Sequence, residues 1–192
     1  MPLNREELLE AAIEYAAREG LADFSMRACA AAIGTSHRML GYHFGTKDQF
    51  LTTIIDAAAA RQRAIIDAFI EARSAAVTPP TAEDIDRGLA ALLLEQDNLR
   101  YAPLMAEATY RIARHPGRHQ GDAPTYADIV DLWTPQLVAL MQLERLPADR
   151  RRARVRLAVA VLVGLSVDYL GSRDAAAYVS AYREWIRLTL DP

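Results

Sequence analysis

The chain has 192 residues, 52% of them hydrophobic and 24% charged, and it is rich in helix-forming residues rather than sheet-forming ones, so we expect an all-α protein. Its formal net charge of −3 excludes a surface that is basic throughout, and any contact with nucleic acid must therefore come from a local patch. The single cysteine excludes an internal disulfide framework, no secretory signal pattern is present, and the longest apolar run, 157–167, is too short to cross a bilayer. We therefore expect a cytoplasmic protein with no membrane partner.

Capping and breaking residues predict the first three helices. In chain order they are Asn4 with Glu7, Gly20, Ser25, Gly34 and Ser36. They place helices over about 4–20, 25–32 and 36–42, with a tight turn between the second and third. Two short helices joined by such a turn are typical of a helix-turn-helix.

The rest of the chain also shows helical periodicity. Thr46 and Gln49 open a fourth helix of close to 28 residues, and Pro79 and Pro80 force a connector after it. We expect Pro103 in the first turn of the sixth helix at best, Pro135 to kink the seventh, Gly171 to end the eighth and Ser172 to cap the ninth. The remaining helices are expected over about 85–93, 99–114, 126–143, 148–170 and 172–189, with a surface loop at 115–124. The prediction is about nine helices and no strand.

The segment from residue 25 to residue 47 has the chemistry of a DNA-reading unit. A helix-turn-helix needs a small residue where its two helices cross, a glycine at the turn and an apolar residue that anchors the second helix. These are supplied by Ala30, Gly34 and Leu40. The other residues expected in a three-helix core are Leu9, Ile13, Phe24, Cys29, Ile33 and Phe44. This unit can therefore fold around its own small core.

Charge in this segment is one-sided. No acidic residue occurs between Asp23 and Asp48, and the helix N-termini at Ser36 and Thr46 add amide donors suited to phosphate. An exposed third helix could reach base edges or the backbone in the major groove. The residues expected to contact DNA are Arg27, Ser36, His37, Arg38, Met39, Tyr42, His43 and Lys47.

These residues resemble the tetracycline-repressor (TetR) family of bacterial regulators over about residues 5–55. The family pattern of alanine, glycine, serine, leucine, tyrosine, His-Phe and lysine stands here as Ala30, Gly34, Ser36, Leu40, Tyr42, His43-Phe44 and Lys47. The resemblance implies that Tyr42 and Lys47 touch phosphates, while His37, Arg38 and Met39 lie nearest the bases. Two residues depart from the pattern: Gly41 replaces a bulky residue, so a phosphate contact made there in relatives is expected to be absent, and Thr35 replaces a valine.

The last two helices carry apolar stripes at helical spacing. Such stripes belong either to the chain's own core or, as the resemblance implies, to a four-helix interface between two copies. The residues expected at that interface are Val155, Val159, Leu162, Val163, Ser166, Tyr178, Tyr182, Trp185 and Ile186.

A ligand pocket is expected among helices four to eight, where large apolar side chains are interspersed with a few polar tips. The candidates are Phe69, Tyr101, Met105, Tyr110, Trp133, Gln136, Leu137 and Leu140. His115, His119 and Asp122 suggest a metal site only weakly, because Pro116 and Gly117 interrupt any helical register, and we expect no metal and no cofactor.

We therefore expect a three-helix DNA-binding domain at 1–46 and a ligand-binding and dimerisation domain at 47–192. The predicted protein is a homodimeric transcription regulator, and by resemblance a repressor that binds a palindromic DNA operator and is released by a partly apolar small molecule. Two copies of a short recognition helix would read half-sites roughly 34 to 36 Å apart. The alternatives are an all-helical enzyme, for which the sequence offers no catalytic motif, and a protein-binding adaptor, which the acid-free segment disfavours.

Overall fold

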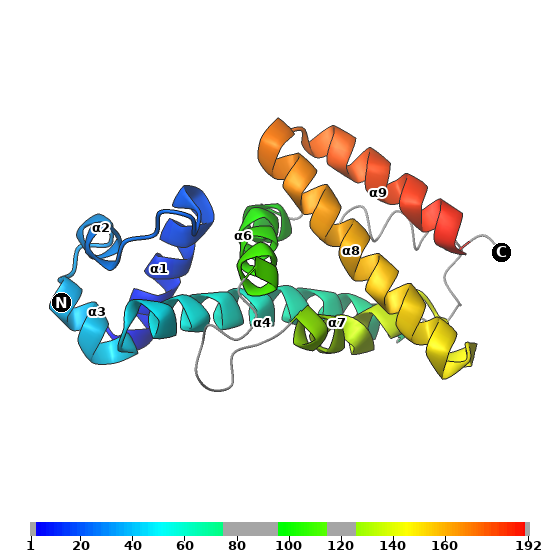
Figure 1. Ribbon diagram of the computed structural model, residues 1–192, viewed down its shortest axis with the longest axis horizontal. Coiled ribbons are helices and arrows are strands. Elements are labelled where there is room, and N and C mark those ends of the chain that lie inside the picture. Colours follow the sequence, from blue (N-terminus) through cyan, green and yellow to red (C-terminus); the bar gives the residue numbers. More distant parts are fainter. Residues whose placement is uncertain (1–2, 75–95, 115–125, 191–192) are drawn as a thin grey trace.

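A computed structural model describes residues 3–74, 96–114 and 126–190, and the regular structure within these ranges is entirely helical (Figure 1). The prediction of an all-α fold with an N-terminal helix-turn-helix and a helical C-terminal part is confirmed. The predicted fifth helix at 85–93, the loop at 115–124 and the weak metal candidates His115, His119 and Asp122 lie outside the described residues.

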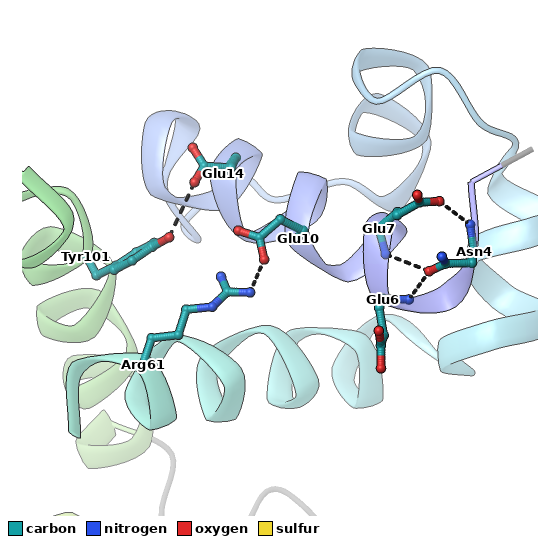
Figure 2. Close-up of polar contacts among 7 residues, drawn as sticks. All are labelled: Asn4, Glu6, Glu7, Glu10, Glu14, Arg61 and Tyr101. Atoms are coloured by element: carbon teal, nitrogen blue, oxygen red, sulfur yellow. Dashed lines mark hydrogen bonds and ion pairs between the residues drawn. The ribbon is translucent and has the colours of Figure 1, made fainter. Parts of the chain in front are cut away.

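The first helix, α1 (Arg5–Glu19), begins where its capping box predicts. Asn4 Oδ1 accepts from the Glu7 N–H at 3.0 Å, and the Glu7 carboxylate accepts from the Asn4 N–H at 2.7 Å (Figure 2). This reciprocal pairing satisfies backbone donors that the first helical turn cannot pair internally. The helix ends at Glu19, before Gly20, as predicted.

The helix-turn-helix consists of α2 (Met26–Ala32) and α3 (His37–Phe44). The Ser25 and Ser36 side chains cap them by accepting backbone N–H groups. Gly34 has a φ of +73°, a left-handed conformation that costs glycine little because it has no Cβ. It lets the Thr35 N–H donate back to the Ala30 carbonyl at 2.9 Å, which makes the turn tight.

A shared aromatic core joins this unit to α4 (Lys47–Ser74). Phe50, on α4, is fully buried; its ring stacks on Phe44 at 4.7 Å and meets Phe24 edge-on at 5.9 Å. The same cluster takes in the predicted core residues Leu9, Ile13, Cys29 and Ile33. Because α4 contributes to this core, the proposed division of the chain at residue 46 separates segments that pack together.

The C-terminal part contains α6 (Gln96–Arg114), α7 (Tyr126–Leu140), a 3₁₀ turn η1 (Leu143–Arg145), α8 (Ala148–Ser172) and α9 (Ala175–Leu190). Figure 1 shows α4 as the long axis of the molecule, with α1 to α3 at one end and α8 and α9 at the other. Helix α6 stands between the two ends and packs against α1, α4, α7 and α8.

Three local predictions were wrong. Pro103 lies well inside α6 rather than in its first turn, where the buried neighbours Ala102 and Leu104 show that packing outweighs the lost backbone hydrogen bond. Helix α7 ends at Leu140, because Gln142 adopts a left-handed conformation that breaks the helix.

The third error concerns the start of α9. Ser172 is the last residue of α8 and does not cap α9, and Gly171 lies inside α8. Asp174 provides the cap instead: its Oδ1 accepts from the Ala177 N–H at 2.9 Å. A carboxylate is a strong N-cap acceptor, and it adds a favourable charge at the positive end of the helix dipole.

Helix α8 is the one described helix whose length and composition would allow it to cross a membrane. It packs on α6, α7 and α9 within the fold, and its first nine residues include five arginines, at 150–152, 154 and 156. Its outer side nevertheless leaves large apolar residues exposed, with Leu157 at 52% and Val167 at 53%. Because these apolar side chains are exposed, the outer side of α8 is suited to packing against another protein surface.

Cys29 lies in the aromatic core with no exposed surface, and burial raises the pKa of its thiol to about 11 from an ordinary 9.0. Since only the thiolate reacts, at about pH 8 the folded chain is expected to react with a disulfide reagent about 100-fold more slowly than the urea-unfolded chain. The absorbance of the released thiol gives both rates, and equal rates would contradict the buried placement. Above pH 9 the thiol ionises in the unfolded chain but not in the folded one, and this lowers the free energy of unfolding. The loss begins near pH 9 and stops growing at about pH 11, where the folded chain ionises too.

Candidate DNA-binding face and internal cavity

The outer side of α3 is open to solvent. Ser36, His37, Arg38 and Met39 are exposed, and Tyr42 is 80% exposed. The opposite side of the same helix is anchored by the fully buried Leu40 and by Phe44. An 8-residue helix held from one side projects its polar residues outward, as a rod that enters a groove must do.

A hollow beside α3 gathers positive charge. The first turns of α2, α3 and α4 meet there and supply Arg27, His37 and Lys47, and the other lining residues are Phe24, Ser25, Met26, Gly45 and Thr46. Helix N-termini carry unpaired N–H groups and a positive dipole end. None of the described residues that line the hollow is acidic. Its chemistry suits an anion such as a backbone phosphate.

The remaining predicted DNA contacts have particular local settings. Ser36 Oγ accepts from the Met39 N–H at 3.1 Å, which leaves its hydroxyl proton free to donate outward. His43 is half-buried, with its ring 5.0 Å from the Tyr42 ring, edge to face. At Gly41, an added Cβ would meet nothing within 4 Å, so no packing inside the chain requires glycine there.

An internal cavity of about 140 Å³ lies among α4, α6, α7, α8 and α9. Five of the predicted ligand residues line it: Met105, Trp133, Gln136, Leu137 and Leu140. The structure does not bring the other three there. Tyr101 is buried in the N-terminal core, Phe69 packs beside the cavity in a cluster with Leu140, and Tyr110 is 62% exposed.

Other cavity residues were not among the predicted ligand contacts. The prediction was based on large side chains, so it did not include four small or polar residues that line the cavity. They are Gln62, Ala102, Ala106 and Thr109. Residues assigned instead to the dimer interface are Val159, Leu162, Val163, Ser166, Tyr178 and Tyr182. The helical periodicity of these last six was a usable signal, but it did not indicate which way the stripe faces.

The nine predicted interface residues therefore face the interior of their own chain. Val155 and Ile186 are buried in its core, and Trp185 packs against them from a half-buried position. The opposite sides of α8 and α9 are the exposed ones. The inward direction follows from α8 packing on α6 and α7, a contact between distant segments that spacing within one helix cannot indicate.

Polar contacts tie the N-terminal helices to α4 and α6. Arg61, on α4, forms an ion pair with Glu10 of α1, and the Tyr101 hydroxyl of α6 donates to Glu14 at 3.3 Å (Figure 2). Burial and the nearby Glu14 charge raise the pKa of Tyr101, which keeps this hydroxyl a donor.

Helix α6 also holds the backbone of the turn after α1. The Glu107 carboxylate accepts from the Leu21 N–H at 2.5 Å, and the Arg111 guanidinium donates to the Leu21 carbonyl at 3.4 Å. Gly20 allows this approach, since a Cβ there would lie 2.9 Å from the Glu107 carboxylate. Residues on another side of α6, among them Met105 and Thr109, line the cavity. One helix thus touches both the cavity and the DNA-binding unit.

Fold and surface together define a helix-turn-helix DNA-binding protein. Residues 8–54 match the family model for bacterial regulatory proteins of the tetR family. Members of this family are transcription regulators that bind DNA and are not enzymes, and over this segment the chain matches their DNA-binding unit. A comparison with curated proteins finds no match.

Solved structures share the fold along nearly the whole chain. A TetR transcriptional regulator from Legionella pneumophila superposes with a TM-score of 0.67 at 15% identity, covering 98% of each chain. The multidrug binding protein EbrR, in complex with imidazole, gives 0.63 at 24% identity, covering 100% of this chain and 98% of its own. A structure described as the molecular basis for control of antibiotic production by bacterial hormones gives 0.64 at 22% identity, covering 96% and 94%. At these identities the likeness establishes the fold.

Proposed function

We propose that this regulator is a cytoplasmic homodimeric repressor that binds a near-palindromic operator through α3 and releases it when a small molecule enters the internal cavity. The observation that carries the proposal is the exposed outer side of α3, with His37, Arg38 and Tyr42 beside the basic hollow of Arg27 and Lys47. This surface supplies both side chains for base edges and cations for phosphates.

The proposed dimer contact is the outer face of α8 and α9. Exposed small and apolar residues repeat there at intervals of four and three on α8 and of four and seven on α9, a spacing that keeps them on one side of each helix, as in two helices packed against each other. They are Ala153, Leu157, Ala160, Gly164 and Val167 on α8, and Ala177, Ala181 and Leu188 on α9. Alanine and glycine permit close approach of the backbones, and burying the stripe removes apolar surface from water.

Ligand control is proposed to run through α6 and α4. Helix α6 lines the cavity, and its Glu107 and Arg111 side chains hydrogen-bond the backbone of Leu21. A ligand that shifts α6 would therefore displace the turn that precedes α2. Release requires that the ligand binds better to a state in which the two recognition helices no longer match the operator. The multidrug binding described for EbrR, which has the same fold, supports a small-molecule effector.

Gel-shift titrations with DNA from upstream of the chain's own gene test the proposal. Lys47→Ala is expected to weaken binding to all sequences. It should also make the plot of log affinity against log salt concentration less steep, by the equivalent of about one phosphate contact per protomer. His37→Ala and Arg38→Ala are expected to change the preference among operator variants, by about tenfold or more at the contacted base.

Arg18→Ala is the matched control, because it removes an exposed arginine from the far end of α1, where its partner is Glu19. It should leave affinity and preference unchanged. Binding that is absent at micromolar protein, or that does not respond to salt, would instead favour the protein-binding adaptor.

A further inference from the structure

None of the described residues that line the cavity carries a charged side chain. Most of these described lining residues are aliphatic or aromatic, and the polar ones among them are Gln62, Thr109, Gln136, Ser166, Tyr178 and Tyr182. Burial raises the pKa of Tyr178, so its hydroxyl stays neutral at physiological pH. A charged molecule entering this space would lose its hydration and meet no opposite charge among the described lining residues.

The hydroxyl protons of two of these residues are already used. Thr109 Oγ1 donates to the Met105 carbonyl and Ser166 Oγ donates to the Leu162 carbonyl, both at 2.8 Å and both within their own helices. These residues therefore hold their polar groups against the helix backbone and leave the cavity wall largely apolar.

Gln136 has a different hydrogen-bonding state. Its side-chain Nε2 donates to Asp67 Oδ1 of α4 at 3.0 Å, whereas its Oε1 is buried and has no partner in the described part of the chain. The orientation of the amide is fixed by chemistry, because an ionised carboxylate only accepts and must face the NH₂ group. The residue is only 9% exposed and lines the cavity. A strong acceptor is therefore held at the cavity wall without a donor.

We propose that the cavity takes a compact, uncharged, largely apolar molecule that carries one hydroxyl or N–H donor, and that this donor binds Gln136 Oε1. The volume of about 140 Å³ is comparable to that of an engineered cavity that holds benzene, which sets the size of the core. The proposal deepens the repressor function and rests on it for its regulatory meaning.

The position of Gln136 also gives the ligand a polar route to α4. A donor on Oε1 polarises the amide and strengthens the donation from Nε2 to Asp67. Asp67 lies on the helix whose first residues, Lys47 onward, belong to the DNA-binding unit. A ligand without a donor would fill the same space but would not act on this hydrogen bond.

Two isosteric pairs of small aromatics test the proposal by calorimetric titration of the full-length protein. Phenol and toluene differ by a hydroxyl in place of a methyl, and benzyl alcohol and benzylammonium differ by a charge. The unaltered chain is expected to bind phenol, toluene and benzyl alcohol, and to bind benzylammonium at least about tenfold more weakly than benzyl alcohol.

The variant that isolates the acceptor is Gln136→Leu, which keeps a similar volume. It is expected to weaken phenol about tenfold while leaving toluene unchanged or slightly tighter. Gln62→Leu makes the same change at another cavity residue and should preserve the ratio of phenol to toluene affinity.

The result that overturns the proposal is an unaltered chain that takes toluene and rejects phenol, or a Gln62→Leu chain that loses phenol as much as Gln136→Leu does. The phenol and toluene measurement needs no variant, so it stands even if Gln136→Leu fails to fold. If none of the four probes binds while operator binding is normal, the proposed ligand class is wrong and the repressor function stands. If the probes bind but the operator does not, the ligand class stands and the repressor function is wrong.

Discussion

A chain carrying both Leu157→Glu and Val167→Glu is expected to be monomeric and to lose about 10²- to 10⁴-fold in operator affinity. Both side chains are half exposed on the outer face of α8, so the proposed partner helix would have to bury four new carboxylates per dimer without counter-charges. The loss of DNA affinity follows because two linked recognition helices bind with an avidity that one cannot reach. Light scattering after size exclusion gives the mass, and a gel shift gives the affinity.

Leu132→Glu provides the comparison, since it adds the same charge at an exposed leucine on α7 rather than on α8 or α9. This chain should stay dimeric and bind DNA normally. Circular dichroism should show that the double variant keeps its helices, because neither substituted side chain belongs to the core. A double variant that remains a dimer would show that the copies associate elsewhere.

The N-terminal unit was predictable from sequence because its determinants are local. The Asn4 and Glu7 capping box, the Ser25 and Ser36 caps and the Gly34 turn each act within a few residues, and each appears in the structure as predicted. The core of this unit could be predicted for the same reason, since three short helices closed by a tight turn leave few ways to pack.

The C-terminal part was less predictable because α8 is apolar on more than one side. Val155 and Val159 form an inward stripe, while Leu157 and Gly164 form an outward one, and both repeat at helical spacing. Spacing identifies residues that share a face, but it does not say whether that face meets the chain's own core or a second copy. The contacts of α8 with α6 and α7 decide this.

The cavity shows the same limit for single side chains. Gln136 and Trp133 were predicted to line it and do, yet Tyr110, chosen for the same size and polarity, lies at the surface beside Arg114. The choice depends on how α6 is rotated about its axis. That rotation is fixed by long-range contacts such as Glu107 with Leu21. The two residues are far apart in the sequence, so a local pattern does not reveal that they meet.

Phe50→Ala is expected to lower the free energy of unfolding by about 3–5 kcal/mol, the usual cost of emptying the space of a buried phenylalanine. Phe50 has no exposed surface, and its ring meets both Phe24 and Phe44. It is also one of the residues through which α4 packs into the core of the helix-turn-helix. The loss should therefore reduce DNA binding together with stability, measured by urea unfolding and gel shift on the same preparation.

Tyr42→Ala is the matched truncation, because it removes a ring of similar size from the neighbouring helix, where that ring is 80% exposed. Little stability should be lost there, since almost no buried surface or cavity is created, while operator affinity should fall as a phosphate contact disappears. The pair thus separates two roles for aromatic side chains less than ten positions apart. Equal losses of stability in both variants would mean that α3 does not present its outer side to solvent, and the surface proposed to read DNA would not exist.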